Sequence, residues 1–273
     1  MTSRSSSTQT TIVIRKIESL AEMHEVERLQ REIWGVDELD VLPALALKPQ
    51  TEVGAILMGA FAEGRMVGFV FGFPGILDGE IILHSDMLGI SEEYRSHSLG
   101  YLLKFAQRDA AMALGVKKIT WTFDPLQSRN AHFNFSKLGV TSDRYYVNYY
   151  GVTSSFLHRH GTDRLWVTWL LNSERVVSRV DAGNTPRTET SGLPHLVRVG
   201  EDVEPLPGDA ISGSQVIIEI PTEIKAHHQR WREATREAFT SAIDSGYVVE
   251  EFYVSARQEV GRYLLTQKHK KSG

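Results

Sequence analysis

A basic loop of small residues that leads directly into an amphipathic helix constrains this chain more than any other feature. The loop and the start of the helix run from Tyr94 to Lys104, and the apolar run Ile81 to Leu83 before them predicts a strand. Leucine and alanine then recur at the three- and four-residue spacing of one helix face. The members of this predicted apolar face are Leu99, Leu102, Leu103, Ala106, Ala110, Ala113 and Leu114.

The turn between the strand and the helix is suited to an anion. The first backbone N–H groups of a helix have no partner within the helix and lie at the positive end of its dipole. Small residues at Ser96, Ser98 and Gly100 would let a phosphate group approach these N–H groups closely. The sequence therefore predicts a pyrophosphate site, with Arg95 beside it to neutralise charge.

Local signals on either side give the order of the elements. Ile12 to Ile14 predicts a first strand, and Ser19 with Glu22 forms a capping-box pattern at the start of a helix. Two apolar runs flank residues 62–65 and predict an antiparallel hairpin. After the central helix, the predicted elements are a strand, a short helix and two more strands, at 117–123, 128–138, 145–150 and 165–171.

The loop resembles the pyrophosphate loop of the GCN5-related N-acetyltransferase (GNAT) superfamily, in which Gln or Arg, two residues, Gly, one residue, and Gly or Ala follow one another. Arg95, Ser98 and Gly100 stand at those places, so serine replaces the first glycine. The order of elements from about Ile12 to about Leu171 is also similar to that superfamily. The resemblance implies an α/β fold with a mixed sheet, and acetyl-CoA or another acyl-CoA as co-substrate.

The resemblance also implies which residues would bind the cofactor. Backbone amides at Leu88 and Ile90, at the end of the strand before the loop, would hold the thioester carbonyl and the pantetheine arm. The other expected contacts come from the loop, the start of its helix and the later short helix. They are Arg95, Ser96, His97, Ser98, Leu99, Gly100, Tyr101 and Ser128.

Acyl transfer from a thioester to an amine needs a base, a polarised carbonyl and an acid for the leaving thiolate. His84 and Asp86 lie one strand period apart, and either could accept the proton; structural roles are the alternative for both. Many relatives carry a tyrosine acid at the position of Phe135, which has no proton to give. Tyr150 is our candidate for a replacement acid, with its neighbours in 145–150, water, or simple sheet packing as alternatives.

Composition limits the partners. The formal net charge of -4, from 30 basic and 34 acidic side chains, gives no general electrostatic reason to bind nucleic acid. The absence of cysteine excludes disulfides and thiolate catalysis and leads us to expect a cytoplasmic protein. Residues 1–10 are polar and lack the apolar core of a signal peptide or membrane span, so we expect a disordered tail. The histidines at 158–160 and 227–228 lack a metal-ligand spacing, and no metal is expected.

The predicted organisation is a GNAT-like domain at 11–175, a linker at 176–195 and a small C-terminal α+β extension at 196–273. The linker is predicted because Ser178 to Pro194 is rich in turn-forming residues. The extension offers a strand, a long helix and two further strands, at 216–220, 222–245, 247–254 and 263–266. We expect it to pack on the first domain, where it would shape the acceptor pocket or a homodimer contact.

Two functions fit these patterns. The first is an acyl-CoA-dependent N-acyltransferase that transfers acetyl from acetyl-CoA to the amine of a small molecule by direct attack. The second is a non-catalytic acyl-CoA-binding or regulatory module whose catalytic residues have decayed. The sequence identifies neither the acceptor nor the preferred acyl chain, and release of coenzyme A on addition of amines would separate the two functions.

Overall fold

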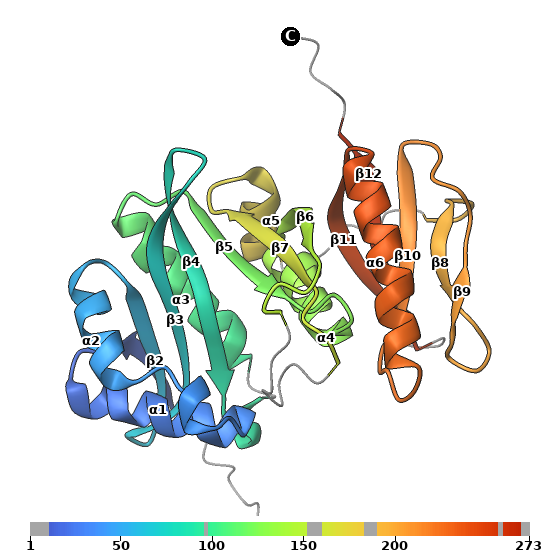
Figure 1. Ribbon diagram of the computed structural model, residues 1–273. Helices are drawn as coiled ribbons and strands as arrows, with labels where there is room; N and C mark the ends of the chain where they lie inside the picture. The colour runs from blue at the N-terminus through green and yellow to red at the C-terminus, as the bar shows by residue number, and fades with distance from the viewer. Residues whose placement is uncertain (1–10, 96–97, 152–159, 183–189, 256–258, 269–273) are drawn as a thin grey trace, which may run out of the picture. The chain divides into compact units, whose positions relative to one another are not determined.

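The computed structural model describes residues 11–95, 98–151, 160–182, 190–255 and 259–268. The chain forms two compact units, Met1–Val116 and Lys117–Gly273. Figure 1 labels their helices and strands. This division lies earlier in the chain than the boundary that composition favours at 176–195. The predicted tail at 1–10 lies outside the described residues.

In the part of the first unit that the structure describes, four strands pair antiparallel in chain order. They are β1 (Ile12–Lys16), β2 (Ile56–Ala62), β3 (Arg65–Leu77) and β4 (Glu80–Ile90). The predicted hairpin joins β2 and β3 through Glu63 and Gly64, which have φ values of 51° and 80°. Positive φ at both central residues is typical of the turn whose twist matches that of the flanking strands, so the loop fixes the register of the pair.

Helix α1 (Leu20–Trp34) begins at the predicted capping box. Ser19 Oγ accepts from the Glu22 amide at 3.2 Å, and the Glu22 carboxylate accepts from the Ser19 amide at 3.5 Å. After the 3₁₀ turn Glu38–Asp40, helix α2 (Ala44–Glu52) joins α1 in a core cluster with Phe69 and Phe71 of β3. The two helices therefore cover one face of the strands.

Helix α3 (Leu99–Ala113) follows the 3₁₀ turn Glu92–Tyr94 and covers the other face. Leu99 and Leu103 pack there against strand residues, as predicted. Its buried face differs from the predicted one, however, because Lys104 and Gln107 are buried while Leu102 is 45% exposed. A sequence pattern that assigns polar residues to solvent cannot find such a face.

The described residues of the second unit form eight strands. Their spatial order is β5 (Lys118–Phe123), β7 (Arg164–Leu170), β6 (Thr141–Tyr146), β11 (Tyr247–Ser255), β12 (Val260–Gln267), β10 (Gln215–Pro221), β8 (His195–Val199) and β9 (Pro205–Pro207). β10 and β8 are parallel and the other neighbours are antiparallel, which confirms the predicted mixed α/β class. Val249 of β11 pairs with Ser142 of β6, so the C-terminal strands continue the strands of residues 117–171.

The helices of the second unit differ in part from prediction. They are α4 (Ser128–Ala131), a π-helix (His132–Leu138), α5 (Glu174–Ala182) and α6 (His228–Asp244). α5 lies partly within the segment predicted to be a linker, and α6 begins later than residue 222, after His227 in a left-handed conformation. The predicted strand at 145–150 ends at Tyr146. Among the described residues, no helix is both long and apolar enough to cross a membrane.

Candidate functional site

The end of β4 directs two backbone amides away from β3. The Ser91 amide donates to the Val67 carbonyl at 2.9 Å, so these residues form a hydrogen-bonded pair of the antiparallel ladder. Such pairs alternate with pairs that are not hydrogen-bonded. Leu88 and Ile90 occupy the alternate positions, and their N–H and C=O groups therefore point away from β3. This is the direction that binding of a thioester and a pantetheine arm would require.

Arg95 lies just beyond the end of β4, after the 3₁₀ turn. Its side chain is exposed, and its Nε is 3.5 Å from the Ile90 carbonyl oxygen, which is a long contact. The guanidinium is thus near the outward-pointing backbone of β4 and is accessible to an anion.

Ser98 precedes α3 in a left-handed conformation, with φ 55° and ψ 17°, and its side chain does not cap the helix. Glycine adopts this conformation at the lowest cost, which gives a physical reason for a glycine at the corresponding place in GNAT loops. The Leu102 amide donates to the Ser98 carbonyl at 3.2 Å. The N–H groups of Leu99, Gly100 and Tyr101 come before this first helical bond and have no acceptor within the helix.

The side chains around this helix start are mainly structural. Leu99 is 1% exposed and belongs to the core, so only its backbone is available to a ligand. The Tyr101 ring packs on Phe105 with ring centroids 4.3 Å apart, and burial raises the pKa of Tyr101. Ser96 and His97 lie outside the described residues. The predicted loop contacts that the structure describes are therefore chiefly backbone groups.

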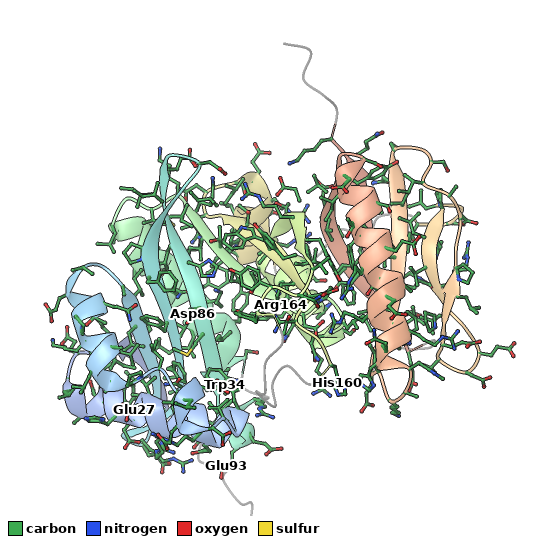
Figure 2. The ribbon with its side chains drawn as sticks, in the orientation of Figure 1. Glu27, Trp34, Asp86, Glu93, His160 and Arg164 are labelled. Carbon is green, nitrogen blue, oxygen red and sulfur yellow. The ribbon has the colours of Figure 1, made fainter. Side chains whose placement is uncertain are left out.

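β4 contains a bulge at the candidate base. Phe71 pairs with Met87 and the next residue, Gly72, pairs with Ser85, so Asp86 is the extra residue of the bulge (labelled in Figure 2). Bulges redirect side chains and are common beside active sites. The sequence did not predict this bulge. His84 and Asp86 were expected to share one face because side chains alternate in a regular strand.

The two candidate bases have opposite pKa shifts. Asp86 is open to solvent, yet desolvation by the surrounding protein raises the pKa of its carboxyl. Burial, and secondly the positive charge of Lys104, lower the pKa of His84 to about 4. The His84 ring also lies against Phe73, with ring centroids 5.5 Å apart. The carboxyl of Asp86 is thus shifted toward stronger basicity, and the imidazole of His84 is shifted toward weaker basicity.

Tyr150 and Ser128 belong to the second unit. Tyr150 lies in a turn after β6 with 48% exposure, and the Arg164 guanidinium carbon is 5.1 Å from its ring centroid. The hydroxyl of Tyr145 donates to the buried carboxylate of Asp163 at 2.7 Å. Among the tyrosines of 145–150, the structure thus gives Tyr145 a packing role and leaves Tyr150 accessible.

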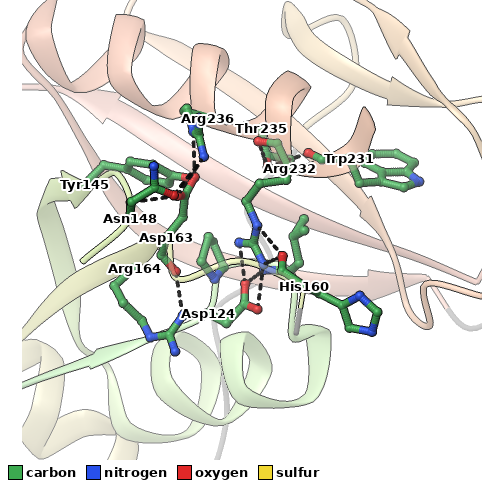
Figure 3. Close-up of polar contacts among 12 residues, drawn as sticks. Asp124, Tyr145, Asn148, His160, Asp163, Arg164, Trp231, Arg232, Thr235 and Arg236 are labelled. Carbon is green, nitrogen blue, oxygen red and sulfur yellow. Dashed lines mark hydrogen bonds and ion pairs between the residues drawn. The ribbon is translucent and has the colours of Figure 1, made fainter. Parts of the chain in front are cut away.

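Ser128 lines a cleft of about 680 Å³ in the second unit, together with Asp124, His132 and Arg232. Arg232 of α6 holds Asp124 in a bidentate pair, with N–O distances of 2.7 Å and 2.8 Å, and also donates to the His160 carbonyl (Figure 3). The guanidinium of Arg232 and the carboxylate of Asp124 are therefore bonded to each other. The pair therefore fixes α6 rather than offering charge to a ligand.

Phe135, at the position of the missing tyrosine, is a core residue. It is fully buried and lies edge-on to Phe123 and Tyr263, with ring centroids 6.1 Å and 5.8 Å apart. The Tyr263 hydroxyl donates to the Pro125 carbonyl at 2.6 Å. Phe135 therefore packs in the core of the second unit, against the C-terminal strand β12.

Comparisons with models of protein families and with curated proteins found no match to this sequence. Among solved structures, the chain is similar to the ribosomal-protein-S18-alanine N-acetyltransferase from Escherichia coli, at 13% identity and a TM-score of 0.48, over 60% of this chain and 96% of that one. An acetyltransferase of the GNAT family from Streptococcus pneumoniae matches at 19% identity and a TM-score of 0.47, over 58% of this chain and 98% of that one.

A third similar structure is the PaiA N-acetyltransferase from Thermoplasma acidophilum in complex with coenzyme A. It matches at 16% identity and a TM-score of 0.42, over 58% of this chain and 98% of that one. At these identities and scores, the similarity says nothing of the chemistry of this chain. Separately, no group of three or more histidine, aspartate or glutamate side chains within the described ranges is arranged to hold a metal ion.

Proposed function

We propose that this chain is an acyl-CoA-dependent N-acetyltransferase of the GNAT type that transfers acetyl from acetyl-CoA to the amine of a small molecule by direct attack. The observation that carries the proposal is the end of β4 in the first unit. There the amides of Leu88 and Ile90 point away from β3, and the chain then turns through Arg95 and Ser98 into the start of α3.

This backbone suits the two ends of an acyl-CoA. The N–H groups at the start of α3 and the Arg95 guanidinium attract the negative diphosphate. An amide at Leu88 or Ile90 donates to the thioester oxygen, where negative charge develops as the carbonyl carbon is attacked. Fixed donors of this kind stabilise the transition state without needing to reorganise.

The proposed reaction has one bond-forming and one bond-breaking event at the carbonyl carbon. The amine nitrogen bonds to this carbon, and Asp86 accepts the proton that the nitrogen loses. The bond from carbon to sulfur then breaks, and the thiolate receives a proton from an acid. His84 is the alternative base. Tyr150 remains the candidate acid, and water is its alternative.

A turnover assay tests this function. Because the chain has no cysteine, a thiol reagent reports released coenzyme A without background from the protein. We expect release above the hydrolysis rate with at least one amine from a panel of polyamines, aminoglycosides, amino acids and short peptides. Tight binding of acetyl-CoA with no release for any amine would instead support a non-catalytic module, and no shift of the melting temperature with acetyl-CoA would contradict cofactor binding.

A further inference from the structure

Helix α3 buries a lysine beneath β4. Lys104 is 3% exposed, and its Nζ donates to Ser85 Oγ at 2.8 Å and to Gln107 Oε1 at 3.1 Å. Ser85 Oγ also donates to Gln107 Oε1 at 2.8 Å. Ser85 and Gln107 are themselves 6% and 0% exposed, so the three side chains form a buried polar cluster inside the first unit. Burying an ammonium group is costly, and such a cost is commonly tolerated for function.

The cluster lies directly at the β4 bulge. Ser85 stands between His84 and Asp86 in sequence and pairs with Gly72 of β3, at the position where the register shifts. A Cβ on Gly72 would lie 2.8 Å from Gln107 Nε2 and 2.9 Å from the His84 carbonyl oxygen. The glycine therefore leaves the space that the cluster occupies, and the bulge and the cluster depend on each other sterically.

We propose that Lys104 is a positioning residue whose ammonium group, bonded to Ser85 and Gln107, fixes the bulge that carries Asp86 and places a positive charge behind His84. The effect of Lys104 on catalysis rests on the function proposed above. The effect of its charge on the titration of His84 does not. This effect has a definite direction: a nearby positive charge disfavours protonation of an imidazole, so His84 stays neutral to lower pH.

The charges around the cluster support this assignment. Other ionisable side chains on the strands that contact α3 are Arg15, Lys16, Arg65, Glu80, His84 and Asp86. Arg15 pairs with Glu22 and Arg65 pairs with Glu93, at exposed positions. Exposed charges of α1, on the other face, pair along the helix.

On α3 itself, Arg108 follows Lys104 by one turn and pairs with Asp109 at 3.5 Å. Burial, and secondly the positive charge of Lys104, lower the pKa of His84. Burial in turn lowers the pKa of Lys104 to about 7, so the ammonium group is still charged in the acidic range where an ordinary histidine becomes protonated.

The test is the titration of His84 in the full chain, followed by NMR of labelled histidine and assigned with His84→Gln. In the wild type we expect a pKa near the value of about 4 given by its surroundings. In Lys104→Met, which has a similar shape and no charge, we expect the pKa of His84 to rise by about one unit. Arg108→Met is the matched control, because it removes a positive charge from the same helix, and it should leave the titration unchanged.

Equal titration of His84 in the wild type and in folded Lys104→Met would overturn the proposal. If that variant does not fold, NMR of wild-type lysine side chains labelled at Cε provides the test. We expect one lysine to titrate near pH 7. Titration of every lysine near its ordinary value would also overturn the proposal. These titrations need neither an acyl acceptor nor turnover. They therefore test the role of Lys104 even if the proposed function is wrong.

Discussion

The two units bury charge in different ways. In the second unit, the carboxylate of Asp163 is fully buried and accepts from Arg236 Nε at 2.9 Å and from the Tyr145 hydroxyl at 2.7 Å (Figure 3). Likewise, Glu251 accepts from Arg175 and Arg179, each at 2.7 Å. In the first unit, the buried ammonium of Lys104 donates instead to the neutral oxygens of Ser85 and Gln107.

The difference separates ion pairs that join distant segments from a buried cation held by neutral groups. Opposite charges that satisfy each other hold α5 and α6 to strands far away in the sequence, and removing one partner leaves the other unpaired. Burial lowers the pKa of Lys104 to about 7, and burial together with the charge of Lys104 lowers that of His84 to about 4. Groups in the ion pairs of the second unit have shifted pKa values as well, since that of Asp163 is lowered and that of Glu251 is raised. Displaced proton equilibria of this kind cluster at functional sites.

The largest expected effect breaks a charge pair of the second unit. Asp163→Ala removes the buried carboxylate that accepts from Arg236 and Tyr145, and we expect the free energy of unfolding to fall by about 3–5 kcal/mol, measured by urea denaturation. Asp143→Ala is the control, because Asp143 is 46% exposed in its pair with Lys268, and it should change the free energy of unfolding by less than about 1 kcal/mol. Equal effects would remove the distinction between buried and surface pairs.

The next effect concerns catalysis in the first unit. Asp86→Asn removes the proposed base while keeping its shape, and we expect turnover to fall by about 100-fold with little change in acetyl-CoA affinity. Steady-state rates and calorimetric binding measure the two quantities. Glu80→Gln, at the far end of the same strand, serves as the control. Unchanged turnover in Asp86→Asn would move the role of base to His84 or to water.

A smaller effect is expected at the start of α3. Gly100→Leu should obstruct the approach of the diphosphate and raise the dissociation constant of acetyl-CoA by tenfold or more, about 1.4 kcal/mol. Gly100→Ala, a small substitution that favours helix, should bind much as the wild type does. Calorimetry on both folded variants tests this, and equal affinity for Gly100→Leu and the wild type would contradict a diphosphate site here.

The smallest effect is a pH dependence of stability. The folded state holds the Lys104 proton less tightly than the unfolded state, with a pKa of about 7 against an ordinary value of 10.5. The unfolded state therefore binds more protons between these values, and the free energy of unfolding rises with pH by at most about 1.4 kcal/mol per unit. Urea unfolding from about pH 7 to about pH 8 should show this rise, about 1 kcal/mol in total, in the wild type and a flatter profile in Lys104→Met. Identical slopes would contradict the buried ammonium.

Much of the fold could be predicted from local patterns. The capping box of Ser19 and Glu22, the hairpin through Glu63 and Gly64, and the extent of α3 all depend on neighbouring residues. α5 could not be predicted in this way, because Arg175 and Arg179 bond to Glu251, more than seventy residues away. Short strands such as β8 likewise depend on the partner strands that they meet.

The site residues stay predictions, and the sequence could suggest only some features of their surroundings. The loop followed from the pattern of a strand and a helix start, whereas Leu88 and Ile90 were expected from the GNAT resemblance. The bulge at Asp86 and the burial of Lys104 were not, because both depend on packing between β3, β4 and α3. A lysine in a helix is ordinarily assigned to solvent, and no sequence signal marks the exception.

The most direct test of the central claim is a crystal structure of the chain grown with saturating acetyl-CoA. We predict the diphosphate against the N–H groups of residues 98–101 and the thioester oxygen within hydrogen-bond distance of the Leu88 or Ile90 amide. A cofactor bound elsewhere, or a loop that stays empty at saturation, would contradict the account.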